Sequence, residues 1–127
     1  MIFEIGDSYM QINDAIIEID PGRGTYPLLL NGRIMIPIRA VIEGKGGIVN
    51  WDENNDRITV YDDNRIIIMQ IDINDYSVDG QAYRMDVKPF LLNDRAMLPL
   101  RFVMEGLGYH VEWIGSANKA EHIWKHK

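Results

Sequence analysis

The sequence predicts an α+β fold of mainly short antiparallel strands wrapped around two small helices, with an internal pseudo-twofold repeat. Three observations predict it. Residues 27–51 and 89–113 align at a constant offset of 62, and 14 of their 25 positions are identical. Turn-forming dipeptides separate short apolar runs, a pattern typical of hairpins. The 127 residues, 46% of them hydrophobic, suffice for one core. We therefore expect a single domain, 1–127, made of two repeats of about 1–64 and 65–127.

Each repeat is predicted to begin with a hairpin. Asp79-Gly80 stands between two short strand-like runs, and both residues can adopt the positive φ that a two-residue turn needs. Asn13-Asp14 is its weaker counterpart in the first repeat. This upstream similarity also places Ile19-Asp20 where Met85-Asp86 lies, once a four-residue insertion in the first copy is allowed for.

The duplicated segment predicts a strand, a tight turn, a second strand and a helix of about two turns. In each copy an asparagine opens the turn and an arginine follows it. A proline then suits the first helical position, where a missing N–H costs nothing, and a glycine can end the helix in the left-handed conformation. A strand ending in tryptophan follows. The residues are Asn31, Arg33, Pro37, Gly46 and Trp51 in the first copy, and Asn93, Arg95, Pro99, Gly108 and Trp113 in the second.

Further strands are expected after the first tryptophan. A polar turn over residues 52–56 leads to Arg57–Tyr61, whose apolar and polar side chains alternate as in a half-buried strand. A second turn leads into Arg65–Ile73, which we expect to be an exposed edge strand. The segment Ile114–Trp124 fits the corresponding hairpin of the first copy poorly, which leaves the pairing of the last strand open.

Charge and composition exclude several classes of function. The formal net charge is −6, which disfavours binding to nucleic acid and to anionic membranes. Residues 1–64 hold 5 basic and 11 acidic side chains, whereas residues 65–127 hold 8 of each, so the first half carries the whole excess. The absence of cysteine excludes disulfides, thiolate metal sites and a cysteine nucleophile. No apolar run reaches transmembrane length, and Met1–Ile5 does not predict a signal peptide.

The motif P-x-L-L-N-G-R-x-M-x-P-x-R-x-V-x-E-G-x-G-x-x-V-x-W, present twice, resembles the copper amine oxidase N-terminal-like domain, also called the stalk domain. Glu18–Thr25 resembles that family's leader, while Asp94 replaces its usual glycine. The resemblance implies a strand-rich sheet around a helix, standing away from any active site. It also implies a secreted or surface protein, largely from Gram-positive bacteria, that is not an enzyme.

The residues give no support to copper chemistry. An amine oxidase centre needs three imidazoles on copper and a tyrosine that becomes a quinone cofactor. The only histidines are His110, His122 and His126, and no two of them form a His-x-His pair. Asn74-Asp75-Tyr76 has the wrong order for a cofactor tyrosine. We therefore expect no catalytic residues and no cofactor.

Two sets of residues are weak candidates for a metal site, and each set also has an ordinary structural interpretation. His122 and His126 would share a face if the tail were helical, although a solvated tail is favoured. Four side chains match positions one, three, five and twelve of a calcium loop, but Arg57 replaces the required glycine and a polar hairpin turn explains them better. Those four are Asp52, Asn54, Asp56 and Asp63.

The remaining motif residues have structural interpretations. Arginine and glutamate four residues apart predict an ion pair on each helix, formed by Arg39 with Glu43 and by Arg101 with Glu105. The arginines beside the turns are expected to tie strands to helix ends. The two tryptophans, with Met35 and Met97, are expected to be core residues.

The function that these observations favour is a non-catalytic extracellular or cell-surface accessory module. It would serve as a spacer, an assembly interface or a platform that binds a protein or a cell-wall polymer, and it could dimerise through the edge strand Arg65–Ile73. The alternative is a carbohydrate- or peptidoglycan-binding module that uses exposed aromatic side chains, and a metal-binding domain is a more remote one. The aromatic candidates are Tyr26, Tyr61, Tyr83, Tyr109 and Trp124.

Overall fold

The computed structural model describes residues 1–12, 14–114 and 120–125, with the backbone alone for residues 113–114, 120–122 and 125. Within these residues the chain forms fourteen strands and two short helices. In chain order they are β1 (Ile2–Glu4), β2 (Tyr9–Ile12), β3 (Ala15–Glu18), β4 (Leu28–Leu30), β5 (Arg33–Pro37), α1 (Arg39–Gly44), β6 (Ile48–Asp52), β7 (Arg57–Asp62), β8 (Arg65–Gln70), β9 (Asp75–Val78), β10 (Gln81–Arg84), β11 (Phe90–Leu92), β12 (Arg95–Pro99), α2 (Leu100–Gly106), β13 (Tyr109–Ile114) and β14 (Ala120–Lys125).

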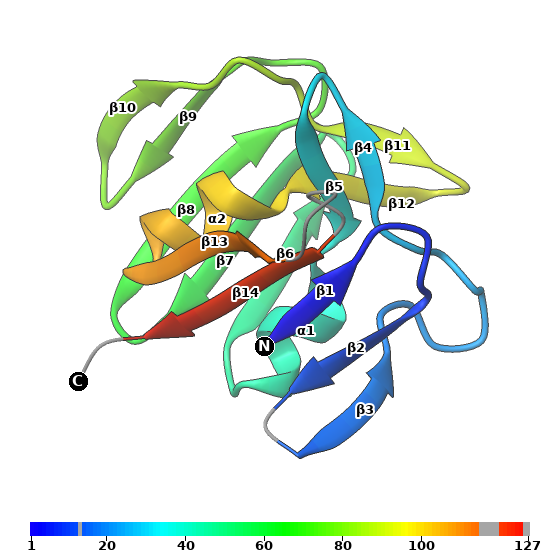
Figure 1. Ribbon diagram of the computed structural model, residues 1–127. Coiled ribbons are helices and arrows are strands. Elements are labelled where there is room, and N and C mark those ends of the chain that lie inside the picture. The colour runs from blue at the N-terminus through cyan, green and yellow to red at the C-terminus, as the bar shows by residue number, and fades with distance from the viewer. Residues whose placement is uncertain (13, 115–119, 126–127) are drawn as a thin grey trace.

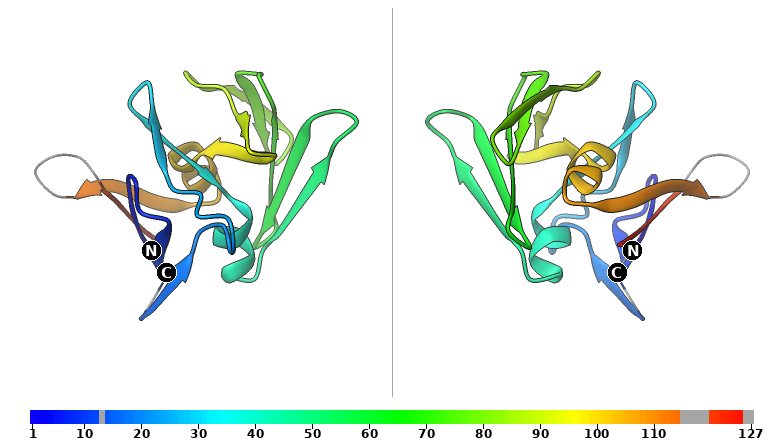
Figure 2. Two further views of the ribbon diagram at one scale, coloured as in Figure 1. Left: turned by 90° about the vertical axis from the view of Figure 1, so that its right-hand side faces the viewer. Right: turned by 90° about the vertical axis from the view of Figure 1, so that its left-hand side faces the viewer.

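The strands form three antiparallel sheets. Two have five strands each, in the orders β13-β14-β1-β2-β3 and β10-β9-β8-β7-β6, and the third has four, in the order β11-β12-β5-β4. The five-stranded sheets lie on opposite sides of the molecule, with the helices between them (Figures 1 and 2). The predicted α+β class, with mainly antiparallel strands and two small helices, is confirmed.

The four-stranded sheet joins the two halves of the sequence. β5 and β12 pair antiparallel, with Ile36 opposite Leu98, Met35 opposite Pro99 and Pro37 opposite Met97. Ile36 and Leu98, which are 62 positions apart, both have no exposed surface. Each helix follows directly from one of these two strands, so their pairing also fixes where α1 and α2 start.

Each five-stranded sheet also combines strands from both halves. β7 pairs with β8 on one side of the molecule, and β14 pairs with β1 on the other. The pairing of the last strand, which the sequence left open, is with both β13 and β1. The solvated tail favoured around His122 is therefore wrong, because His122 lies in β14 and the neighbouring Ile123 is buried. The segment Arg65–Ile73 is not an edge strand either, since β8 lies between β7 and β9. Its backbone groups already have partners, which removes the predicted route to a dimer.

The helix ends correct one prediction and confirm another. α1 has Ile38 as its N-cap, while Pro37 still belongs to β5, and Pro99 is the N-cap of α2. The prolines thus precede the first helical position that we predicted for them. Gly46 and Gly108 have φ of 92° and 94°, the left-handed conformation that ends a helix without a Cβ penalty.

The tight turns match their predicted dipeptides. Asn31 and Gly32 have φ of 51° and 79°, and Asp79 and Gly80 have φ of 52° and 84°. Positive φ at both positions is the geometry that keeps the twist of the flanking strands. Asn93-Asp94 makes the same kind of turn without glycine, with φ of 50° and 63°. Asn13 lies outside the described residues, and β2 and β3 flank it in an antiparallel pair.

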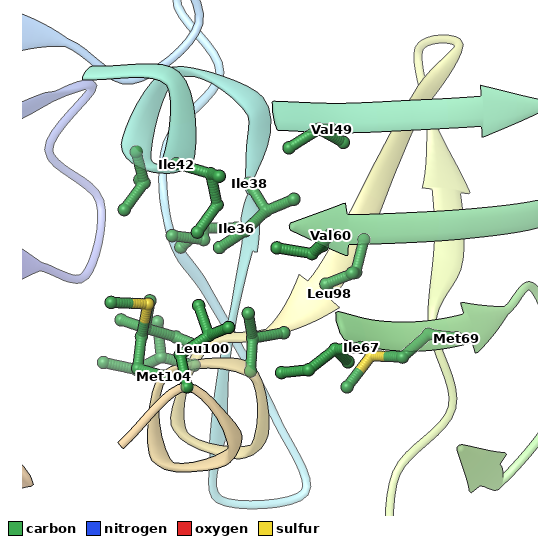
Figure 3. Packing of buried hydrophobic residues seen from close by; sticks show 14 of the residues in the cluster. Ile36, Ile38, Ile42, Val49, Val60, Ile67, Met69, Leu98, Leu100 and Met104 are labelled. Carbon is green, nitrogen blue, oxygen red and sulfur yellow. The ribbon is translucent and has the colours of Figure 1, made fainter. Parts of the chain in front are cut away.

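The main core fills the space between the sheets and the helices. In Figure 3, Val49, Val60 and Ile67 of the β6–β10 sheet point toward side chains from β5, β12 and the helices. A second, smaller core cluster consists of Met35, Val87 and Met97, all buried. The predicted core positions of the two methionines are confirmed.

Truncation of the central pair tests this arrangement. Ile36→Ala removes apolar contacts that cannot be replaced by local collapse, so we expect the free energy of unfolding to fall by about 2–5 kcal/mol. Chemical denaturation followed by tryptophan fluorescence measures it. Leu29→Ala is the control, because Leu29 lies opposite Ile34 on the neighbouring strand but is 53% exposed. Equal losses from the two variants would contradict a core centred on the β5–β12 pair.

Candidate functional site

A groove beside α1 is a concave surface to which both repeats contribute. Two adjoining hollows of about 110 and 530 Å³ share Pro37, Arg39 and Arg95 in their walls. We call the two together the α1 groove. Ile38, Val49, Trp51, Ile58, Asp94, Ala96 and Leu98 complete the smaller hollow, and Ile19, Asp20, Pro21, Ala40 and Glu43 complete the larger.

A buried carboxylate holds the arginine at the centre of the α1 groove. The Nε atom of Arg95 donates to Oδ1 of Asp20 at 3.0 Å, and the hydroxyl of Thr25 donates to Oδ2 at 2.6 Å. The side chain of Asp20 is 6% exposed and that of Arg95 is 39% exposed. The carboxylate of Asp20 therefore holds the guanidinium in place, and the exposed part of the Arg95 side chain lines the groove.

The corresponding ion pair joins Arg33 of the first repeat to Asp86 of the second. The Nε and Nη2 atoms of Arg33 donate to the two carboxylate oxygens of Asp86 at 3.1 and 2.9 Å. These hydrogen bonds hold the pKa of the Asp86 carboxyl below its usual value. Both ion pairs join residues from different repeats, which corrects the prediction that these arginines tie strands to helix ends. Asp86 is 61% exposed, so its pair is the more accessible to water.

The predicted ion pairs on the helices are present. Nη1 of Arg39 lies 3.1 Å from Oε2 of Glu43 on α1, and Nη1 of Arg101 lies 3.3 Å from Oε2 of Glu105 on α2. All four arginines of the duplicated motif are thus bound to carboxylates of the same chain. Pairs as exposed as these contribute little to stability.

Trp51 packs against the core as predicted, but it also forms part of a surface. It is only half-buried, packs against the core and lines the smaller hollow of the α1 groove, so it is part of a surface as well as a core anchor. Trp113 lies in β13, and its side chain is outside the described part of the structure.

The acidic candidates for calcium are separated by the fold. Asp52 accepts hydrogen bonds from the backbone of Asn54 at 3.1 Å and from the side chain of Asn55 at 2.9 Å, as in a polar hairpin turn. Asp56 belongs to the same turn, with φ of 51°. Asp63 lies beyond the far end of β7, and a strand of six residues spans about 20 Å. The four side chains therefore do not converge on one ion.

The histidine candidates do not form a metal site within the described residues. His122 lies in β14, so the helical spacing on which the pair with His126 depended is absent, and His126 lies outside the described residues. His110 stacks on Trp124 with ring centroids 5.5 Å apart. The described residues contain no group of three histidine, cysteine or carboxylate side chains placed to hold a metal ion.

The predicted aromatic side chains do not gather in one place. Tyr26 is in the loop before β4, Tyr61 is on β7 and Tyr83 is on β10, and each is exposed. Tyr61 and Tyr83 line two separate hollows. Tyr109 is half-buried, and the ammonium group of Lys45, which is also paired with Asp62, lies 4.2 Å from its ring centroid. The predicted rings therefore do not form one shared platform, although Tyr83 shares its hollow with Tyr76 and Phe102, which the sequence did not single out.

Sequence reasoning missed the two residues that shape the α1 groove. Asp20 is the buried anchor, and its alignment with Asp86 was the only available signal. Ala40 stands where the second copy has Phe102, a difference already present in the aligned segments. The consequence of that difference depends on neighbours from the other repeat, which no local pattern shows.

Comparison with known proteins gives one match. Residues 23–121 match the family model described as the copper amine oxidase N-terminal domain. That stretch covers well over half of the chain and contains both copies of the motif. A search of curated proteins finds no significant relative. Among the described residues, no helix is long and apolar enough to cross a membrane.

The two cross-repeat ion pairs should differ in their effect on stability. Asp20→Ala leaves Arg95 and the Thr25 hydroxyl without their buried acceptor, so we expect a loss of about 1–3 kcal/mol in the free energy of unfolding. Asp86→Ala is the matched control and should cost clearly less, because water reaches that pair. Urea denaturation measures both. A larger loss for Asp86→Ala would contradict the anchoring role of Asp20.

The titration of Asp86 tests the second ion pair. Its pKa is lowered in the folded state, so the pair stabilises the protein above the unfolded pKa, and that stabilisation is lost as the pH falls through the folded pKa. Arg33→Gln should move the NMR titration midpoint of the Asp86 carboxyl upward and weaken the dependence of stability on pH in the acid range. Arg23→Gln should leave the midpoint unchanged, since Arg23 bonds to the Asn93 carbonyl. An unmoved midpoint in Arg33→Gln would refute the assigned cause.

Proposed function

Because the chain belongs to the copper amine oxidase N-terminal domain family, we propose that it is an accessory module that acts outside the cell or on its surface, without catalysis of its own. The N-terminal domain of copper amine oxidases is an accessory, non-catalytic domain. The match over residues 23–121 is the observation that carries this proposal. The composition is compatible with it, since a cysteine-free chain needs no particular redox compartment.

The side chains do not fit the copper of the family's name. Copper in an amine oxidase needs three imidazoles, and the described residues bring no three metal-ligating side chains together. The charged residues of the motif are also engaged with one another, as Arg39 with Glu43 and Arg95 with Asp20 illustrate. Groups paired in this way hold the fold and are poorly placed to act as acids or bases on a substrate.

We further propose that the pseudo-twofold repeat organises the module. Matched contacts support this: Ile36 faces Leu98, while the ion pairs of Arg33 and Arg95 each reach the opposite repeat. A duplicated framework of this kind presents two similar surfaces, of which the α1 groove is one. A binding platform needs such a rigid support for its contact residues.

The placement of the chain ends favours a platform over a spacer. β1 and β14 pair antiparallel, with Ile2 opposite His122, so the first and last described strands lie side by side (Figure 1). Any segments joined to these two strands would leave from neighbouring positions. A module attached in this way adds little length between its neighbours but presents its remaining surface freely. We propose a partner that is a protein or a cell-wall polymer.

Co-sedimentation with isolated Gram-positive cell walls tests the proposal. Walls that retain their proteins should carry the chain into the pellet, and walls stripped by protease should not if the partner is a protein. Retention on stripped walls would identify the polymer and support the carbohydrate alternative. No retention on either would overturn the platform. Consumption of a primary amine by the copper-treated chain would overturn the non-catalytic assignment.

A further inference from the structure

The two copies of the motif carry different side chains at one equivalent helix position. Phe102 on α2 is the counterpart of Ala40 on α1, 62 positions apart. Each stands near an arginine that pairs with an aspartate of the other repeat. The two positions therefore have matched surroundings, but only one of them supplies an aromatic ring.

In the second copy the ring is in place. Phe102 packs against both core clusters, including the one that contains the buried Val87. The guanidinium carbon of Arg33 lies 5.1 Å from the Phe102 ring centroid, within the range of a cation–π interaction. The ring of Tyr76 meets it edge-on, with centroids 5.9 Å apart. Phe102 is thus partly buried against both clusters beside an arginine, and its remaining surface lines a separate hollow of about 330 Å³.

In the first copy the ring is missing and the site is open. Ala40 lines the larger hollow of the α1 groove, about 530 Å³ in volume, together with Ile19, Pro21 and Pro37. Pro21, the counterpart of Val87, is exposed, whereas Val87 is buried. These four apolar residues share the lining with four charged ones, and the hollow has the size of sites that take small groups from a ligand.

The cation of the open site is already held in position. Arg95 corresponds to Arg33, and its partner Asp20 is buried and accepts a second hydrogen bond from Thr25. A guanidinium fixed in this way loses little freedom when a ring packs against it. Arg39 and Glu43 stand at the same hollow and can exchange their mutual hydrogen bond for bonds to a peptide backbone.

We infer that the α1 groove is a docking site for an aromatic side chain of a partner protein, which inserts beside Ala40 and packs against Arg95 as Phe102 packs beside Arg33. The inference rests on the proposed platform function for the existence of a partner. The second copy specifies the occupant, because the same kind of site is satisfied there by a phenylalanine. A sugar fits the larger hollow less well, since its lining consists of aliphatic, proline and charged side chains without an aromatic ring.

NMR titration of the isotope-labelled chain with N-acetyl-L-phenylalanine amide tests the inference. We expect saturable shifts of the backbone amides near Ile19, Ala40 and Arg95, with a dissociation constant of about 1 mM, the scale for a fragment of this size. N-acetyl-L-leucine amide should bind at least fivefold more weakly. Intermolecular NOEs should join the ring protons to the Ala40 methyl. The absence of saturable shifts, equal affinity for the leucine amide, or tighter binding of N-acetylglucosamine in the groove would overturn the inference.

Two variants complete the test. Ala40→Phe supplies the missing ring from within the chain and should abolish the shifts, while Ala82→Phe places the same ring on the exposed surface of β10 and should bind like the unmodified chain. Unchanged binding in Ala40→Phe would overturn the inference. In the cell-wall assay, loss of retention in Ala40→Phe alone would place the partner in the groove. Retention without fragment binding would refute the groove but not the platform, and fragment binding without retention would refute the platform.

Discussion

The antiparallel pairing of β5 with β12 is the constraint on which the rest of the molecule depends. It places Ile36 against Leu98 with both side chains fully buried, and it joins strands from the two halves of the sequence. α1 and α2 follow these strands directly, so the register of one strand pair determines where both helices begin. A slip by one residue would turn every buried side chain of a strand to the opposite face. That penalty makes the register unique.

The same pairing brings each arginine at the start of one strand to a carboxylate of the other repeat. Arg95 reaches Asp20 and Arg33 reaches Asp86, and neither partner is near in sequence. Such long-range pairs cannot form until the central strands are in register. The five-stranded sheets also combine the two halves, through β7 with β8 in one sheet and β14 with β1 in the other. Neither half contains a complete sheet of its own.

The sequence predicted the locally encoded parts of this structure. Positive φ at Asp79-Gly80 and the left-handed glycines after the helices follow from chemistry within a few residues, and both are present. The sequence did not predict that β8 would be central or that β14 would pair with β1, because an apolar run does not specify its neighbours in a sheet. The same limit applies to the site. Arg95 was recognised as a motif residue, but its partner Asp20 is 75 positions away, and the α1 groove exists only where the two meet.

The absence of an aromatic ring beside Ala40 affects the stability of the folded chain. Full burial of a phenylalanine side chain contributes about 1.5–3 kcal/mol, and the partly buried Phe102 gives the second copy a share of this stabilisation that Ala40 does not give the first. The first copy nevertheless retains the costly part of the arrangement, a buried Asp20 that fixes a cation beside a hollow lined in part by apolar residues. A carboxylate in that position is desolvated whether or not a ring is present. Arg95 is therefore held in place without the ring contact that Arg33 makes with Phe102. The chain loses the stability of that contact, and a ring from a partner can supply it.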